Sequence, residues 1–335
     1  MRHVRLSPPL FAVASVLALA CSAPAPRPVV VVGFSADPAV AVPGRVMTSA
    51  DGETWESPRS IGEGGEWLIE ITPRGDGYAA IGLKGGVYLS DGSGAAWTRE
   101  AVHVSWLDAL KFVPSDPSIA YLAGAGAWWR STDAGATWSQ QIPPGYYFED
   151  FAFKDGRRGV GVEGSLEPSR GVVWLTTDGG TAWTGVAETG AGLRAVAAAG
   201  DAGAELWAAG DAGTLIVSTD GGARWSDLPW LSLTETPDYT AFDFPTPHAG
   251  FLVGSHGVVR AYRAAGPVAS RWTIVRTGPF VLQGVFARDA QNAWACGYRT
   301  YTDRGVILRT RDGGASWRVE VETPGVFWYG VAGRR

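Results

Sequence analysis

Cysteine is scarce in this chain of 335 residues, which contains only Cys21 and Cys296. Two cysteines can form at most one disulfide, so a disulfide framework is excluded. Cys296 lies in an apolar run that reads as a strand, where a small buried side chain is a simpler interpretation than a catalytic thiol. The four histidines show no metal-ligand spacing. The sequence therefore predicts no metal site and no cofactor.

Lysine and long apolar runs are also scarce. The chain has three lysines among its 28 basic residues, which are outnumbered by 33 acidic residues, and its net charge is −5. Because there is no basic run and no basic face, nucleic acid is not a predicted partner. The apolar run at residues 10–20 is too short to span a bilayer.

The N-terminus reads as a targeting segment. Basic residues precede the apolar run, so residues 1–20 are predicted to be a signal peptide. Residues 18–21, Ala-Leu-Ala-Cys, resemble a bacterial lipobox, which implies that Cys21 is lipidated and anchors the protein to a membrane. The small residues before Cys21 also satisfy an ordinary signal peptidase, which would give plain secretion. Residues 21–28 are predicted to form an extended Pro/Ala tether.

The residue after the cysteine bears on location. Ser22 resembles the residue found at this place in lipoproteins that are sorted to an outer membrane. The expected location is therefore the bacterial cell envelope, as an outer-membrane lipoprotein, or otherwise the periplasm or the medium.

Glycine and tryptophan, in contrast, are abundant, with 46 and 16 residues. Seven tryptophans recur every 41–47 residues, at positions 55, 97, 138, 183, 225, 272 and 317. Four of them end a repeated segment, Ser/Thr-x-Asp-x-Gly-x-x-Trp. Its key residues are Asp133, Gly135, Trp138, Asp178, Gly180, Trp183, Asp220, Gly222, Trp225, Asp312, Gly314 and Trp317. A period near 40–45 residues with four strand-like runs is typical of a propeller blade.

The two ends of the chain are incomplete blades. Residues 29–34 and 44–49 read as later strands of a blade whose first strand does not precede them. Residues 325–332 read as the first strand of a blade, but no further strands follow them. The sequence predicts an all-β, seven-bladed β-propeller of four-stranded antiparallel blades over residues 29–335. The C-terminal strand is expected to complete the N-terminal blade, which would leave no open gap in the ring.

The repeated segment reads as scaffold chemistry. An aspartate in a tight turn accepts hydrogen bonds from the following backbone N–H groups, and the glycine adopts a positive φ. These carboxylates would be spread around the ring at the turns between third and fourth strands, so they cannot converge on one substrate. We therefore expect them to be structural and not catalytic.

Function is expected on the opposite rim. Its loops carry aromatic and arginine side chains, a mixture that suits a protein or glycan partner. The alternative is that these are ordinary loop residues, some packed onto the ring. The candidate binding residues are Tyr146, Tyr147, Trp230, His256, Tyr298, Arg299, Tyr301 and Arg304.

The repeats resemble the Asp-box (BNR) repeat, and the chain looks most like the photosystem II stability/assembly-factor type of (WD/YVTN/BNR-like) propeller. That resemblance implies a monomeric, non-catalytic binding or assembly scaffold, which presents one face to an unidentified protein or glycan. The alternative is an Asp-box glycoside hydrolase, similar to sialidases or glucanases. It would need two acids facing each other across a cleft, and the pairs to examine are Asp150 with Asp238 and Glu149 with Glu235.

Overall fold

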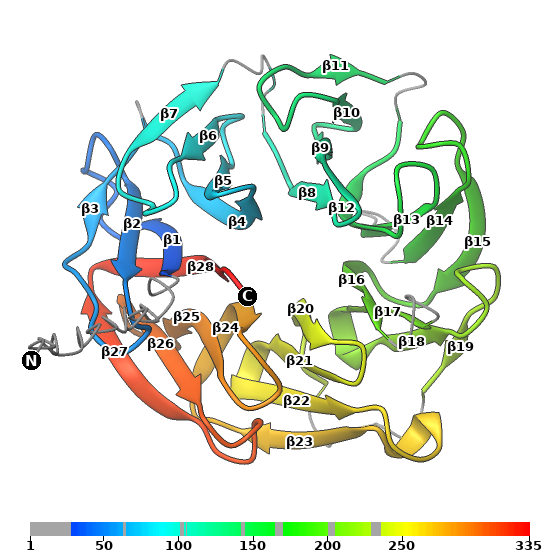
Figure 1. Ribbon diagram of the computed structural model, residues 1–335. Coiled ribbons are helices and arrows are strands. Elements are labelled where there is room, and N and C mark those ends of the chain that lie inside the picture. Colours follow the sequence, from blue (N-terminus) through cyan, green and yellow to red (C-terminus); the bar gives the residue numbers. More distant parts are fainter. Residues whose placement is uncertain are drawn as a thin grey trace, which may run out of the picture.

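Strands form a closed ring around a central axis in the computed structural model (Figure 1). The structure describes residues 28–62, 65–100, 104, 106–141, 145–164, 170–199, 205–228 and 236–335. The predicted signal peptide, Cys21 and the candidate rim residue Trp230 lie outside these residues, so the lipid anchor stays a prediction. Within the described ranges no helix is long and apolar enough to cross a membrane.

Five blades of the ring are four-stranded antiparallel sheets. The first consists of β4 (Leu68–Arg74), β5 (Gly77–Gly82), β6 (Val87–Ser90) and β7 (Trp97–Glu100). The second consists of β8 (Ala109–Val113), β9 (Asp116–Gly124), β10 (Ala127–Ser131) and β11 (Ser139–Gln140). The third consists of β12 (Phe148–Phe153), β13 (Gly159–Gly164), β14 (Gly171–Thr176) and β15 (Thr184–Thr189).

The other two four-stranded blades contain short 3-10 turns. One consists of β16 (Leu193–Ala199), β17 (Glu205–Gly210), β18 (Leu215–Ser218) and β19 (Ser226–Asp227), with η2 (Asp211–Gly213) between β17 and β18. The other consists of β20 (Tyr239–Thr246), β21 (Ala249–Gly254), β22 (Val258–Arg263) and β23 (Trp272–Arg276), with η4 (Ser255–Gly257) and η5 (Val268–Ser270). In each blade the first strand lies nearest the axis (Figure 1).

The remaining eight strands form one continuous sheet, which we call the closing sheet. It contains β24 (Phe280–Ala287), β25 (Ala293–Arg299), β26 (Arg304–Thr310), β27 (Arg318–Pro324), β28 (Val326–Gly333), β1 (Val29–Ser35), β2 (Gly44–Ser49) and β3 (Arg59–Ser60). The all-β propeller class is confirmed, but the prediction of seven four-stranded blades is wrong: the structure has five such blades and this larger sheet.

A one-residue turn explains the larger sheet. Only Gly325 separates β27 from β28, and its φ of 69° allows a sharp reversal that most residues resist. The Gly325 N–H donates to the Asp303 carbonyl, 2.7 Å away. The start of β28 is therefore held beside the start of β26, where Arg304 and Val326 pair in parallel and join two groups of strands.

The C-terminal strand closes the ring. β28 lies antiparallel to β1 from Val29 opposite Gly333 to Ser35 opposite Val326. The strand at the end of the chain thus completes the strands at its beginning, as their sequences predict. The β4–β7 blade covers one face of β1 and the strands β24–β26 of the closing sheet cover the other, which explains why four consecutive valines, Val29–Val32, are all fully buried. Cys296 is also fully buried, in agreement with its prediction as a small core residue.

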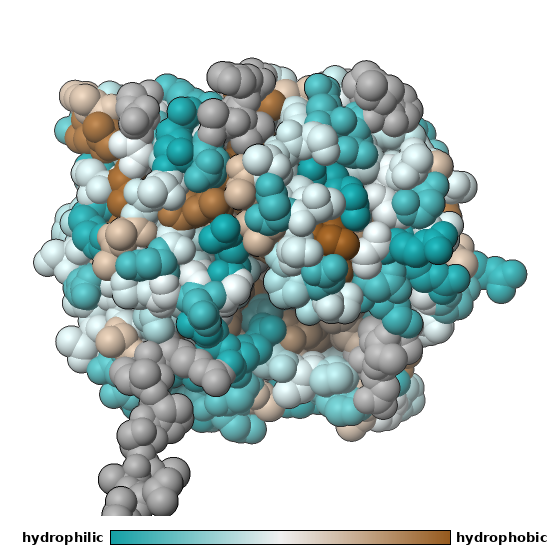
Figure 2. Space-filling model, turned by 45° about the horizontal axis from the view of Figure 1, so that its top comes forward, coloured by the Kyte–Doolittle hydropathy of each residue, from teal (hydrophilic) through white to brown (hydrophobic). Residues whose placement is uncertain are grey.

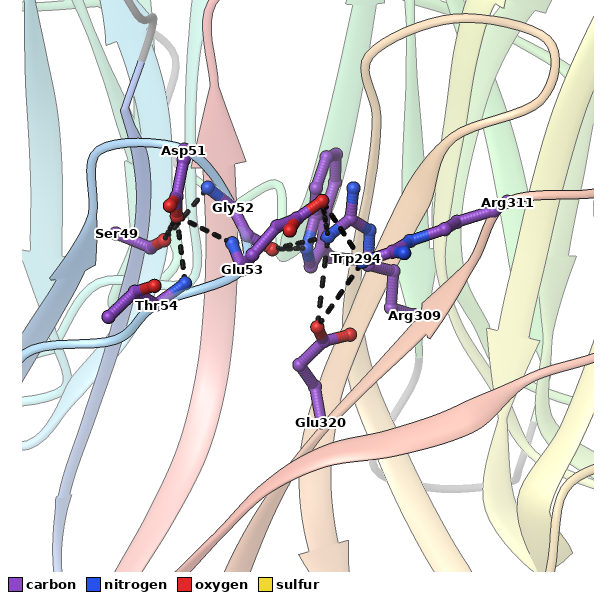
Figure 3. Close-up of polar contacts among 9 residues, drawn as sticks. All are labelled: Ser49, Asp51, Gly52, Glu53, Thr54, Trp294, Arg309, Arg311 and Glu320. Atoms are coloured by element: carbon purple, nitrogen blue, oxygen red, sulfur yellow. Dashed lines mark hydrogen bonds and ion pairs between the residues drawn. The ribbon is translucent and has the colours of Figure 1, made fainter.

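Figure 3 shows how the loop between β2 and β3 locks onto the other half of the closing sheet. The Gly52 carbonyl accepts hydrogen bonds from the Trp294 indole and the Arg309 guanidinium, both at 2.9 Å. Glu53 forms ion pairs with Arg309 at 3.3 Å and with Arg311 at 3.0 Å. The buried Trp294 ring is therefore fixed from the side of Gly52.

We predict that Gly52→Ala destabilises the fold more than Gly221→Ala does. Both glycines have nearly the same φ, 76° and 75°, so alanine carries the same backbone cost at each. A Cβ at Gly52 would clash with the fixed Trp294 ring, whereas a Cβ at Gly221 would meet nothing. The extra loss for Gly52→Ala should be about 1–3 kcal/mol in urea unfolding. Equal losses would contradict the locking role of this contact.

Candidate functional site

The repeated Ser/Thr-x-Asp turns hold their own carboxylates. Asp133 accepts hydrogen bonds from the Thr137 hydroxyl, from the Thr137 N–H at 2.8 Å and from the Ser131 hydroxyl at 2.8 Å. Together these three bonds lower the pKa of Asp133 to about 2. The pKa of Asp312 falls to about 2 through equivalent bonds from Ser316 and Thr310, and those of Asp178 and Asp220 are also lowered. Carboxylates that are held ionised in this way are poor general acids.

The glycines and tryptophans of these turns face the protein interior. Gly135, Gly180, Gly222 and Gly314 all have positive φ. A Cβ on Gly180 would clash with Trp128 of the preceding blade. Trp138, Trp183, Trp225 and Trp317 pack in four hydrophobic clusters that each join neighbouring sheets. The turns therefore bind one blade to the blade before it.

The innermost strands surround a central cavity of about 960 Å³. Three of its carboxylates bridge neighbouring blades, since each accepts a backbone N–H from the next innermost strand. Glu70 accepts from Leu110 at 2.7 Å, Asp150 from Val196 at 3.0 Å and Asp243 from Ala287 at 2.6 Å. These contacts tie the blades together around the axis.

A lysine connects two of these carboxylates. Lys111 forms ion pairs with Glu70 and, at 3.1 Å, with Asp150. Burial opposes the charged form of Lys111, but Asp150 and Glu70 outweigh that effect and keep its pKa above the ordinary value. Asp238, the other member of a predicted acid pair, accepts the Ala212 N–H at 3.0 Å. Asp150 and Asp238 thus have structural partners, and Glu235 lies outside the described residues.

Two further carboxylates lie at the start of innermost strands, where the channel opens. Asp108 directly precedes β8 and Glu149 lies in β12, and both line the cavity. Burial raises the pKa of Asp108 to about 6. Burial, reinforced by the charge of Asp108, raises the pKa of Glu149 to about 7. The nearby Arg194 is ion-paired with Asp211. We call Asp108, Glu149 and Asp211 the acidic sector of the mouth.

Aromatic side chains occupy another part of the same mouth. Trp67 is 41% exposed and stacks on Phe34 with ring centroids 4.9 Å apart. Phe34 also contacts Tyr329, at 5.1 Å, and Phe327, at 5.9 Å, and Tyr298 lies 5.0 Å from Phe327. Phe34, Trp67 and Tyr329 line the cavity. We call these five residues the aromatic sector.

The predicted rim residues divide among several places. Tyr298 belongs to the aromatic sector, but Arg299 and Arg304 both pair with Glu322, the latter at 3.9 Å. Tyr301 is fully exposed and Tyr147 is 50% exposed. The other two described rim residues, Tyr146 and His256, contact neighbours that are close in sequence.

Tyr146 is half-buried, because its ring packs on Phe148 and against the edge of Trp174. His256 is exposed in η4, where its Nδ1 lies 3.4 Å from the Ser255 hydroxyl. Of the predicted rim residues that the structure describes, only Tyr298 belongs to the aromatic sector.

The sequence interpretation missed Phe34, Trp67, Asp108 and Tyr329 as site residues. One signal was available. In each blade a large buried apolar residue near the start of the innermost strand is followed by one of Ile69, Asp108, Glu149, Arg194, Thr240, Gln283 and Tyr329. All seven residues line the cavity, and around the ring they are apolar, acidic, basic, neutral polar and aromatic in turn. The visible surface in Figure 2 is largely hydrophilic, with separate hydrophobic patches and a hollow toward the middle of the ring. Among the described residues, no three histidine, cysteine or carboxylate groups are arranged to hold a metal ion.

No family model matches the chain. A xyloglucanase from a Paenibacillus species is 28% identical over 226 residues, which are 61% of this chain and 19% of that enzyme. The chain therefore spans about a fifth of the curated relative that it matches.

Solved structures give a broader likeness. YCF48 from Cyanidioschyzon merolae has a TM-score of 0.57 and 16% identity, over 76% of this chain and 84% of that one. YCF48 bound to a D1 peptide also has a TM-score of 0.57, with 18% identity over 91% and 93%. The GH74 enzyme of Niastella koreensis has a TM-score of 0.60 and 17% identity, over 76% of this chain and 45% of that enzyme. At these identities the likeness is one of fold.

We predict that Glu149 titrates near neutral pH. Its pKa rises from an ordinary 4.5 to about 7, so between these values the folded state binds a proton that the unfolded state has released. The free energy of unfolding should therefore decrease as the pH rises from about 4.5 to 7, by roughly 3 kcal/mol from this group.

Two measurements check this prediction. The carboxyl carbon shift of Glu149, followed by NMR, should have its midpoint near 7. The variant Glu149→Gln should flatten the decrease in stability, whereas Glu188→Gln, on the outer strand β15, should leave it unchanged. A midpoint near 4.5 would contradict the burial of this carboxyl group.

Proposed function

We propose that the protein is a non-catalytic binding scaffold of the cell envelope, which holds a segment of a protein partner at the mouth of its central channel. The observation that carries this proposal is the aromatic sector. Its rings pack on one another at the edge of the cavity, and Trp67 is left 41% exposed. Exposed aromatic side chains beside a concavity are characteristic of binding hot spots.

The comparisons give supporting analogies. A likeness over nine-tenths of both chains links this fold to YCF48 bound to a D1 peptide, so a fold of this kind accepts a peptide. The predicted signal peptide and Cys21 support a place in the cell envelope, and a lipid anchor would keep the scaffold at a membrane. Neither argument identifies the partner.

Capture of the partner tests the proposal. We expect the full chain, crosslinked in its own membrane, to recover a protein partner that Trp67→Ala recovers at least tenfold less, because truncating an aromatic hot spot typically costs about 2 kcal/mol or more. Tyr147→Ala is the matched control, since Tyr147 is 50% exposed, against 41% for Trp67, but does not line the cavity. Equal recovery by wild type and Trp67→Ala, measured by quantitative mass spectrometry, would count against this site.

A glycosidase is the second candidate, and a specific observation favours it. Asp108 and Glu149 line one cavity and both have raised pKa values, as an acid catalyst requires. The 28% identity to a xyloglucanase points in the same direction. The pKa values of both carboxyl groups are raised, however, whereas a glycosidase needs the second carboxyl group ionised as nucleophile or base.

Hydrolysis assays separate the two functions. On our proposal, wild type should release no more reducing sugar from xyloglucan than Glu149→Gln does. If wild type hydrolyses the polymer and Glu149→Gln lowers kcat by roughly 100-fold or more, the enzyme interpretation is correct and the scaffold interpretation is wrong.

A further inference from the structure

The mouth of the channel has two chemically different sides. Phe34, Trp67 and Tyr329 come from β1, the loop before β4, and β28, whereas Asp108 and Glu149 come from the next two blades along the ring. All five residues line the same cavity. A ligand that enters the mouth therefore meets an aromatic sector and an acidic sector at once.

The aromatic sector is uncharged. Burial raises the pKa of Tyr329 to about 12, so its hydroxyl stays neutral at any physiological pH. Trp67 stacks on Phe34 and keeps an exposed apolar surface, which suits the side chain of an aromatic residue, a proline or a leucine.

The acidic sector is neutralised only in part by the protein's own cations, because Arg194 acts on both Glu149 and Asp211. It has three carboxylates, Asp108, Glu149 and Asp211, and Arg194 forms its ion pair with Asp211. Lys111, the cation lower in the channel, is held by Glu70 and Asp150. Within the described residues neither Asp108 nor Glu149 forms an ion pair, so a cation supplied by a ligand would be favoured there.

We infer that the partner segment is cationic and apolar: it places an aromatic or aliphatic side chain on the aromatic sector and an arginine or lysine side chain beside Asp108 and Glu149. This inference rests on the proposed function and specifies the chemistry of its partner. Acidic peptides and nucleic acids are excluded by like charge. A neutral glycan would stack on Trp67 and donate hydroxyl hydrogen bonds to the carboxylates, but it would gain no charge attraction from them, so it is the competing occupant.

Binding of such a segment is linked to pH. The groups that face Glu149 are Asp108, Asp150, Arg194 and Asp211. A bound cation favours the ionised carboxylates, so Asp108 and Glu149 release protons when the segment binds. Affinity should therefore rise as the pH increases from about 5.5 to 8, and it should change little for a neutral ligand.

Peptide selection on the full chain tests the inference. A phage-displayed library of random linear dodecapeptides is selected at pH 8 on wild type, with elution at pH 5.5. We expect enrichment of peptides that combine arginine or lysine with an aromatic or large aliphatic residue. The affinity of a selected synthetic peptide, measured by fluorescence anisotropy, should fall at least tenfold at pH 5.5 and at least tenfold in Trp67→Ala.

The charge variants isolate the acidic sector. The double variant Asp108→Asn/Glu149→Gln should lose the preference for basic residues and the pH dependence while keeping the aromatic preference. The control Glu188→Gln/Asp227→Asn removes two exposed carboxylates from the outer strands β15 and β19 and should behave as wild type.

Three outcomes would overturn the inference. Selected peptides without basic residues that still need Trp67 would refute the cationic partner and leave the proposed function standing. Binding of a xyloglucan oligosaccharide through Trp67, with no peptide selected, would identify a neutral glycan. Peptide binding that is unaffected by Trp67→Ala would refute both the inference and the proposed site.

Discussion

The pairing of β28 with β1 is the contact on which the rest of the structure depends. It joins residues about 300 positions apart in sequence and turns an open row of blades into a ring. Loop-closure entropy makes such a contact costly to form, so several local interactions support it. The Gly325 turn sets the start of β28, and Gly52, Glu53, Trp294 and Arg309 connect the two halves of the closing sheet.

The ring in turn creates the functional face. The residues of the mouth come from several innermost strands, so no strand makes the site alone. Asp108 and Glu149 become neighbours because their blades are adjacent, and burial at that point raises both pKa values. Phe34 and Tyr329 meet because β1 and β28 pair. Closure of the ring therefore assembles the aromatic sector, whereas adjacent blades form the acidic sector.

These relations explain how far the sequence could predict the structure. Local sequence signals were sufficient to predict the strands, the repeated turns and the pairing of the last strand of the chain with its first strands. Each of these features depends on residues close in sequence or on the repeat. The size of the closing sheet depends on a single bridge beside Gly325, which no pattern reveals. The aromatic sector was missed because its members lie in different repeats, and Arg299 and Arg304 looked available although both contact Glu322.

The carboxylates that bridge the innermost strands also restrict how a peptide can be recognised. A segment that binds by adding a strand needs a row of free backbone donors and acceptors at a sheet edge. Along the channel, the N–H groups of Leu110, Val196 and Ala287 already donate to Glu70, Asp150 and Asp243. β-Augmentation is therefore blocked at these positions, and the same bonds protect the innermost edges from pairing with another chain.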